Sequence, residues 1–224
     1  MEIKESIFLV AEEAIRLNGA VVLENNDSYC LIDDKVAGIY YVCAKQFDFD
    51  VYPLIKDGAK KENTVAVISL SDVELRPLDE FNKVLKVKQY VYRGPKYQIH
   101  VPYEIKEMTM DDYGYLASHY VRNGDDEAYL RNAIERGMLK AVNVDGETMG
   151  FIGEHPEHAL GMLYVSENHR RKGIGTALEK AMINKFIDDG KIPFDHVVLD
   201  NYKSMNLQES LGMELDSGCI YWFF

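Results

Sequence analysis

Short apolar segments separated by turn-forming clusters dominate the first part of the chain. Apolar residues between positions 3 and 17 recur at helical spacing and Asn18-Gly19 follows them, which predicts an amphipathic helix over 3–17. Three β-rich segments come next, and the Asn and Asp clusters between them predict a small antiparallel meander. The three segments are Val21–Glu24, Tyr29–Asp33 and Ile39–Ala44.

The pattern between residues 47 and 93 is less regular. Residues 47–56 fit a helix or an irregular cover that ends at Asp57-Gly58, since Asp-Gly is a strong turn former. Beyond this point the apolar positions follow β spacing, then helical spacing, then β spacing again. They predict a strand at 64–70, a helix at 77–85 and a strand at 86–93.

A break in the pattern falls near residue 95. Gly94-Pro95 interrupts both helix and strand, so we predict two domains, at residues 1–95 and 96–224. No segment before the break carries a chemical signature. The order of predicted elements is similar on the two sides, so the smaller α/β domain at 1–95 could be a degenerate relative of the larger one.

Strands and helices alternate after the break, with a hairpin among them. Thr109 starts a predicted helix as its N-cap, and Asp145-Gly146 is the strongest short turn signal in the chain. The alternation predicts an α/β domain with a mixed sheet. The predicted strands are 97–107, 138–144, 148–154, 159–165, 194–200 and 219–224, and the predicted helices begin at 109, 125, 174 and 204.

One stretch of this second half predicts a ligand. An apolar strand ends at Val165, a basic turn with two glycines follows, and a helix begins at Ile174. The first amides of a helix have no helical partner and lie at the positive end of its dipole, so they favour an anion. Gly173 and Gly175 let a diphosphate approach the backbone. Three cations add charge beside it: Arg170, Arg171 and Lys172.

Two common phosphate-binding motifs do not fit this turn. It has no Gly-Lys-Ser/Thr end, which a P-loop needs to reach nucleoside phosphates and Mg²⁺. It also lacks the third glycine of a dinucleotide fingerprint, and no acidic residue ends a second parallel strand at the expected distance.

Composition narrows the classes of partner. The formal net charge of −12 argues against nucleic acid, because a phosphate-binding surface needs a large basic face. The start of the chain is charged and no apolar run approaches the roughly 20 residues of a membrane span, so we expect a cytoplasmic protein without a membrane partner. The cysteines lie in apolar contexts without a CxxC pattern, which predicts reduced core thiols at Cys30, Cys43 and Cys219.

The turn and its neighbours resemble a known family. Arg170-Arg-Lys-Gly-Ile-Gly175 resembles the Arg/Gln-x-x-Gly-x-Gly/Ala signature of the GNAT superfamily of acyl-coenzyme A dependent N-acetyltransferases, and Gly161–Val165 resembles its preceding central strand. Asp200–Ser204 and Leu207–Met213 look like its later block. Gly150–His155 looks closest to the glycine N-acyltransferase-like branch. The resemblance covers residues 97–224 and implies a mixed, mostly antiparallel sheet flanked by helices.

The resemblance also implies where coenzyme A binds. The main chain of the central strand would pair with the pantetheine arm, and the amides of the turn would hold the pyrophosphate with Arg170 or Arg171 beside it. Asn201 and Ser204 would contact the pantetheine or the thioester region. The implied cosubstrate is acetyl-CoA, with no metal. The implied binding residues are Leu163, Tyr164, Val165, Arg170, Arg171, Lys172, Gly173, Ile174, Gly175, Thr176, Asn201 and Ser204.

The implied reaction is direct attack of an amine on the thioester, which needs a base. Relatives often place a glutamate near the start of the central strand, and the best candidates here are Glu154 and His158, with Glu157 third. For each, a solvated loop residue is an equally good interpretation. Gln208 stands where many relatives carry a tyrosine that protonates the leaving thiolate. Either another group such as Tyr202 supplies this proton, or the thiolate leaves without an acid.

Two function classes therefore stay open. The chain is either an acyltransferase that moves an acetyl or small acyl group to a small-molecule amine or amino-acid-like acceptor, or an acyl-CoA-binding regulatory module that does not turn over. The acidic charge weakly favours a cationic acceptor. The sequence also leaves open a homodimer.

Overall fold

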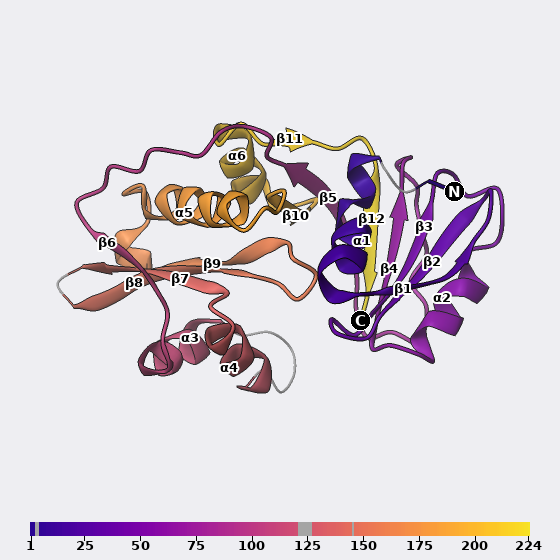
Figure 1. The fold of residues 1–224 in the computed structure, drawn as a ribbon, viewed down its shortest axis with the longest axis horizontal. Coiled ribbons are helices and arrows are strands. Elements are labelled where there is room, and N and C mark those ends of the chain that lie inside the picture. The colour runs from indigo at the N-terminus through magenta and orange to yellow at the C-terminus, as the bar shows by residue number, and fades with distance from the viewer. Residues whose placement is uncertain (3–4, 121–126, 145) are drawn as a thin grey trace. The chain divides into compact units, whose positions relative to one another are not determined.

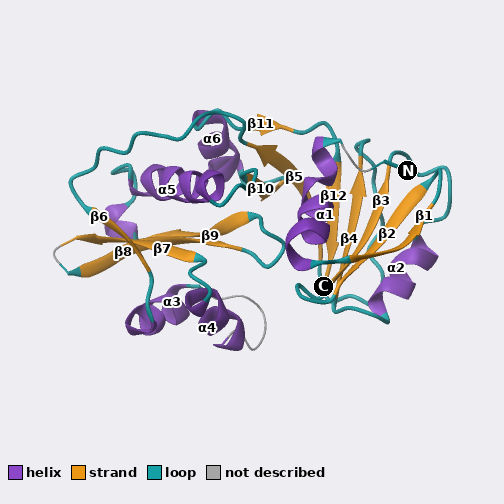
Figure 2. Ribbon diagram, in the orientation of Figure 1, coloured by secondary structure: helices purple, strands orange, loops and turns teal. Residues whose placement is uncertain are grey.

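A computed structural model describes residues 1–2, 5–120, 127–144 and 146–224. The chain forms two units, each a sheet with helices packed on it (Figure 1, Figure 2). Unit 1 comprises residues 1–91, 156–158 and 194–224, and unit 2 comprises residues 92–155 and 159–193.

The sheet of unit 1 has the strand order β1-β2-β3-β4-β12-β5-β10, with β11 also paired to β5. The β3–β4 pair is parallel, whereas β1–β2 and β2–β3 are antiparallel, so the predicted meander is confirmed. The strands are β1 Val21–Asn25, β2 Tyr29–Asp34, β3 Ile39–Ala44, β4 Thr64–Ser69, β5 Val84–Val91, β10 Phe194–Val198, β11 Glu214–Leu215 and β12 Cys219–Phe223.

The helix predicted over 3–17 is observed as three consecutive helical segments that begin at Ser6. Residues 3–4 of the prediction lie outside the described part of the chain. The chain leaves the helix at Gly19, whose φ of 68° is the left-handed conformation that glycine adopts at little cost. The helices of unit 1 are η1 Ser6–Phe8, α1 Leu9–Glu13, η2 Ala14–Asn18, α2 Tyr52–Ala59 and α6 Tyr202–Ser210.

One predicted helix of unit 1 is wrong, and another ends later than predicted. Residues 77–83 are not helical, because the amides of Asn82 and Lys83 donate to the Phe224 carbonyl and β5 begins at Val84. Helix α2 continues through Gly58 instead of ending there. A Cβ at Gly58 would lie 2.5 Å from the Tyr40 ring, so this glycine permits close packing and is not a helix stop.

The cysteine prediction is confirmed, since Cys30, Cys43 and Cys219 are free and buried. Burial raises the thiol pKa of all three, most strongly for Cys43. Cys30 and Cys43 face each other as register partners of β2 and β3. The thiols therefore belong to the apolar core of this unit and not to a reactive site.

Unit 2 contains an antiparallel sheet in the order β6-β7-β8-β9. The predicted hairpin is confirmed in β7 and β8, although Asp145 lies outside the described residues. Helix α5 covers one face of the sheet, and α3 and α4 cover the other (Figure 1). The strands are β6 Glu104–Glu107, β7 Leu139–Val144, β8 Glu147–Glu154 and β9 Leu160–Val165, and the helices are η3 Met110–Asp112, α3 Tyr113–His119, α4 Glu127–Glu135, η4 Glu167–His169 and α5 Ile174–Asp188.

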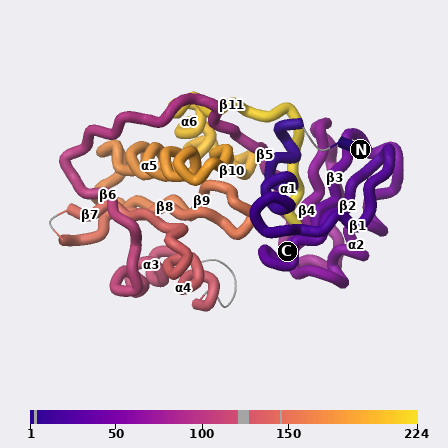
Figure 3. Tube along the Cα trace, viewed as in Figure 1, coloured from indigo at the N-terminus to yellow at the C-terminus, as the bar shows by residue number. Residues whose placement is uncertain are grey.

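The strand predicted over 97–107 is confirmed only at β6. The preceding segment instead runs along α5 (Figure 3), where Lys96 forms an ion pair with Asp188 at 2.7 Å and the Tyr97 amide donates to Asn184 at 2.7 Å. Its backbone polar groups are partly satisfied by helix side chains, so it needs no strand neighbour. The N-cap prediction at Thr109 is confirmed as a capping box with Asp112.

The two units differ from the predicted division at residue 95. The unit break after Val91 lies close to it, but residues 194–224 group with the first unit. The reason is strand pairing: β12 pairs with β4 and β5, and β10 pairs with β5. Local sequence pattern does not reveal such long-range pairings.

Candidate active site

The basic turn of unit 2 has the backbone geometry of an anion cradle. Gly173 is the N-cap of α5 with φ 80°, and Arg171 also has a positive φ of 60°. Alternating left-handed residues before a helix turn successive amides toward one side, which is the arrangement that binds anions. No atom lies within 4 Å of a Cβ built on Gly173, so the glycine is required by its φ and not by crowding.

The three cations of the turn have different roles. Arg170 Nε donates to the Val165 carbonyl at 3.0 Å, and its guanidinium lies 3.5 Å from Glu167. Arg170 therefore braces the turn against the end of β9. Arg171 and Lys172 are exposed on the turn itself, where their charge adds to that of the helix N-terminus.

A cavity of about 480 Å³ opens beside this turn. Its wall combines the turn with the segment that runs along α5, and it includes the basic or titratable side chains of His100, His169 and Lys172. The lining residues are His100, Val101, Pro102, Tyr103, Val144, His169, Lys172, Gly173 and Ile174. The site thus has a cationic cavity next to the amides of the α5 N-terminus.

Strand β9 carries a bulge just before the turn. Phe151 pairs with Tyr164 and Gly153 pairs with Gly161, so β9 has one residue more than β8 between these pairs. Met162, with φ 55°, lies within that bulged stretch. A bulge bends its strand and redirects side chains, and bulges are common next to active sites.

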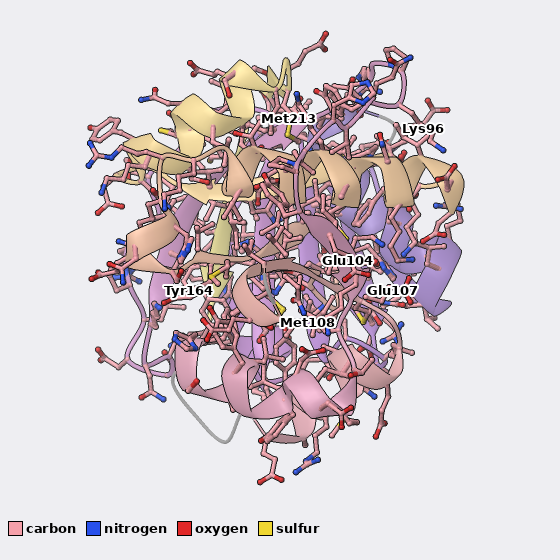
Figure 4. The ribbon with its side chains drawn as sticks, turned by 90° about the vertical axis from the view of Figure 1, so that its left-hand side faces the viewer. Lys96, Glu104, Glu107, Met108, Tyr164 and Met213 are labelled. Carbon is pink, nitrogen blue, oxygen red and sulfur yellow. The ribbon has the colours of Figure 1, made fainter. Side chains whose placement is uncertain are left out.

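The bulge places Met162 and Tyr164 on the face of the sheet that packs against α3 and α4. Both belong to the apolar cluster of that face, and the Tyr164 ring centroid lies 4.7 Å from that of His119. Figure 4 labels Tyr164 and another member of the cluster, Met108. Leu163 and Val165 point to the opposite side, since a Cβ on Gly175 of α5 would lie 3.8 and 3.7 Å from them.

Asn201 and Ser204 are not in the same unit as the turn. They lie at the start of α6 in unit 1, where Asn201 Oδ1 accepts a hydrogen bond from the Ser204 amide at 3.2 Å. This is an ordinary N-cap, which by itself accounts for an Asn three residues before a Ser. Their role toward coenzyme A stays a prediction.

Glu154 lies in a buried ion pair. Its side chain is 3% exposed, and Lys191 Nζ, itself 15% exposed, donates to Glu154 Oε1 at 2.6 Å. Lys191 also lies 5.3 Å from the Phe186 ring of α5. A carboxylate held by a buried ammonium has a structural function whether or not it has a catalytic one.

His158 has a comparable local role in unit 1. It is buried with φ 65°, and its Nε2 lies 3.0 Å from Asn18 Oδ1. Asn18 Nδ2 also donates to the Pro156 carbonyl at 3.2 Å, so one side chain fixes this turn at two points. Glu154 and His158 thus belong to different units, and their assignment as base stays a prediction.

Gln208 is fully buried, and its Nε2 donates to Asp195 Oδ2 at 2.8 Å. Burial raises the pKa of Asp195 to about 7, although the hydrogen bond from Gln208 opposes the shift. The side-chain amide of Gln208 is not an acid, and here it donates to a buried carboxyl of unit 1. Tyr202, the alternative acid, is 70% exposed.

Sequence reasoning missed His155 and Tyr129. The Tyr129 hydroxyl of α4 lies 3.0 Å from His155 Nδ1, on the face opposite α5. The alternation of side chains in a strand could have indicated this, because adjacent residues such as Glu154 and His155 point to opposite faces. The partner, 26 residues away, could not have been identified from local pattern.

Within the described ranges, no group of three or more His, Cys, Asp or Glu side chains is arranged to hold a metal ion. In the same part of the chain, no helix is long and apolar enough to cross a membrane.

Comparisons with known proteins agree with this architecture. The model of the FR47-like protein family matches residues 137–222, which contain the turn, β9 and α5. No curated protein sequence matches the chain significantly.

Solved structures with a similar fold cover nearly the whole chain. A Drosophila protein superposes with a TM-score of 0.62 at 16% identity, over 94% of this chain and 75% of its own. A putative GNAT-family acetyltransferase from Novosphingobium aromaticivorans has a TM-score of 0.60 at 15% identity, over 90% of this chain and 89% of its own. A GNAT-family acetyltransferase from Colwellia psychrerythraea has a TM-score of 0.53 at 14% identity, over 91% of this chain and 83% of its own.

These likenesses define the class of fold. The chain has a mixed α/β fold with a mostly antiparallel sheet flanked by helices, as GNAT-type structures have, so the predicted fold class is confirmed. The family-model match and the neighbours together support the GNAT superfamily. The glycine N-acyltransferase-like branch and the relation of the first half to the second stay predictions.

Proposed function

We propose that this protein is an acyl-CoA dependent N-acetyltransferase that moves an acetyl or small acyl group from coenzyme A to a small-molecule amine or amino-acid-like acceptor. The observation that carries the proposal is the turn before α5, with left-handed Arg171 and Gly173 leading into the helix. The GNAT-type fold and the FR47-like match over the same segment support it.

The residues of the turn fit the diphosphate of coenzyme A. The amides of Arg171 to Thr176 would hold the phosphates, and Arg171 and Lys172 would neutralise their charge. The main chain of Leu163–Val165 would pair with the pantetheine arm. The cationic cavity next to Gly173 supports an anionic ligand at this end, because His169 and Lys172 contribute to its wall.

The reaction is a direct transfer. The acceptor ammonium loses one proton to a base, and its nitrogen lone pair then attacks the thioester carbonyl to form the C–N bond. The C–S bond breaks, and the thiolate takes the second nitrogen proton. The base returns the first proton to solvent. Bound coenzyme A supplies the activated acyl group, and the protein supplies orientation and proton removal.

A second candidate function is acyl-CoA binding without turnover. Gln208 favours it, because it stands in the sequence where many relatives carry the tyrosine that acts as the acid, and its side-chain amide is occupied by Asp195. The transfer remains our first proposal, since a thiolate is a good enough leaving group to depart without an acid at neutral pH.

Thermal unfolding with and without acetyl-CoA tests the cosubstrate. We expect acetyl-CoA to raise the Tm of the wild type, and Gly173→Glu to abolish the shift, because it puts a carboxylate and a strained φ into the cradle. Gly114→Ala, at an exposed site with open space, is the matched control and should keep the shift. Release of the coenzyme A thiol with amines then separates transfer from binding alone.

A further inference from the structure

A second cavity, of about 510 Å³, lies in unit 1 between the first strands of the sheet and helix α2. Strand β1 is the last strand in the sheet order, so the cavity lies at a sheet edge. Its apolar wall is formed by Leu23 of β1, Leu31 of β2 and Leu54 of α2. The volume is within the range of small-molecule pockets, roughly 300 to 1,000 Å³.

The side chain of Tyr40 also lines this cavity, and the residue is only 2% exposed. A Cβ on Gly58 would lie 2.5 Å from Tyr40 Cδ1 and 3.0 Å from Cγ, so the backbone end of the ring packs against α2 and the hydroxyl lies at the other end. Among the residues that the structure describes, this hydroxyl has no hydrogen-bond partner. Buried hydroxyls normally have one, so Tyr40 points to a ligand atom in the cavity.

The hydroxyl of Tyr40 lies close to carboxylates of the cavity wall. Burial raises the pKa of Tyr40 to about 12, and the negative charges of Asp57, Asp33 and Glu24 add to the shift. Asp57 and Glu24 are both lining residues. The phenol therefore keeps its proton at neutral pH and can donate it to a ligand.

The carboxylates of the wall differ in their partners. Asp57 Oδ1 accepts from Lys60 Nζ at 2.7 Å, so these two charges neutralise each other. Glu24 Oε1 accepts from the Tyr29 hydroxyl at 2.8 Å and from Asn26 Nδ2 at 2.9 Å. These neutral donors orient the Glu24 carboxylate, and within the described part of the chain no cation pairs with it.

The remaining charge of the wall is the ammonium of Lys61. Its Nζ lies 5.5 Å from the centroid of the Tyr40 ring, and the described residues include no carboxylate in an ion pair with it. Together with Glu24 and the Tyr40 hydroxyl, Lys61 leaves one anion, one cation and one hydroxyl available around an apolar cavity. This set is complementary to a small zwitterion with an apolar body.

We infer that the cavity of unit 1 binds a free α-amino acid with an apolar side chain. The ligand ammonium pairs with Glu24, its carboxylate pairs with Lys61 and accepts from the Tyr40 hydroxyl, and its side chain packs against the leucines of the wall. An apolar acid would bring a second negative charge to Glu24, and an apolar amine a second positive charge to Lys61. The inference is independent of the proposed function, because the turn before α5 belongs to unit 2.

Calorimetric titration of the full chain tests the ligand class. We expect saturable binding of L-leucine and L-phenylalanine. Leucinamide lacks the carboxylate, 4-methylpentanoate lacks the ammonium and glycine lacks the apolar body, so each should bind at least about ten-fold more weakly than L-leucine.

Three variants locate the site. Lys61→Gln should weaken L-leucine binding by about ten-fold or more, and Tyr40→Phe by about three- to ten-fold. Without ligand, Tyr40→Phe should keep the Tm of the wild type, because its hydroxyl has no partner to lose. Lys83→Gln changes an exposed lysine of the same unit outside the cavity wall, and it should bind L-leucine as the wild type does.

Loss of affinity in Lys61→Gln and Tyr40→Phe, with none in Lys83→Gln, supports the inference. Absence of saturable binding of both amino acids to the wild type overturns it. Equal affinity in the wild type, Lys61→Gln and Tyr40→Phe also overturns it, because the amino acid then binds elsewhere. Glycine binding as tight as that of L-leucine contradicts the apolar part of the site. The Tm shift with acetyl-CoA is measured separately, so the proposed function can fail or stand without affecting these results.

Discussion

Two adjacent residues at the end of β8 show how the two faces of the unit 2 sheet differ. On the α5 side, Glu154 is 3% exposed and bound to Lys191 at 2.6 Å. On the side of α3 and α4, His155 contacts the Tyr129 hydroxyl at 3.0 Å and lies over Gly161. One face uses a titratable group to stabilise the fold, and the other presents one beside the bulged strand. A candidate base therefore has to be judged by its partner as well as by its residue type.

The largest expected effect comes from breaking the Glu154–Lys191 pair. Glu154→Leu leaves an ammonium buried without its partner, and we expect a loss of about 3–5 kcal/mol in the free energy of unfolding. Adding Lys191→Met should restore most of it, because two apolar side chains replace the pair. Urea unfolding of the two single variants and the double variant measures the coupling. A single variant as stable as the wild type but inactive would instead favour Glu154 as the base.

A second buried carboxyl, Asp195, should make the stability of the fold depend on pH. Burial raises the pKa of Asp195 to about 7, from an ordinary value of 3.8. Between these values the folded state holds a proton that the unfolded state releases, so stability falls as pH rises from about 4 to 7, by up to about 4 kcal/mol. The stabilisation by protonated Asp195 is fully present below its pKa in the unfolded state, 3.8, and is lost as the pH rises through its pKa in the folded state, about 7.

The Asp195→Asn variant tests this pH dependence. It should flatten the slope of unfolding free energy between about pH 4 and 7, while it keeps an acceptor for Gln208. Asp27→Asn, at an exposed carboxyl of the same unit, serves as the control and should retain the slope. If Asp195→Asn leaves the slope unchanged, the raised pKa of Asp195 does not cause the pH dependence of the free energy of unfolding.

A smaller effect is expected at Gly161. Gly161→Ala puts a Cβ within 2.3 Å of His155 Nε2, so the imidazole or β9 has to move, at a cost of about 1–3 kcal/mol. Thermal unfolding and thiol release measure the two consequences. Gly114→Ala meets nothing within 4 Å and is the control. Full activity in a stable Gly161→Ala variant would mean that the ring position does not matter.

Local patterns were enough to predict much of the fold. The first helix, the meander and the start of α5 follow from periodicity and turn residues within a few positions of one another. The predicted helix at 77–85 failed because the Phe224 carbonyl, far along the chain, accepts from Asn82 and Lys83. For the same reason local pattern could not predict that residues 194–224 group with the first unit, since β12 pairs with β4 and β5.

In the candidate site, too, the features formed by neighbouring residues could be predicted and those formed by distant residues could not. The turn at 170–176 could be predicted because glycines and cations at short spacing are themselves the binding feature. The candidates for the base could not be ranked, because the partners Lys191 and Asn18 come from distant positions.

The most direct test compares Gly173→Glu with Gly114→Ala in one thermal-unfolding assay. Both substitutions replace a glycine at a site where no atom lies within 4 Å of the new Cβ. The account predicts that acetyl-CoA raises the Tm of Gly114→Ala as it raises that of the wild type, whereas Gly173→Glu loses the shift, because its carboxylate repels the phosphates at the N-terminus of α5. A full shift in Gly173→Glu, or no shift in the wild type, would contradict it.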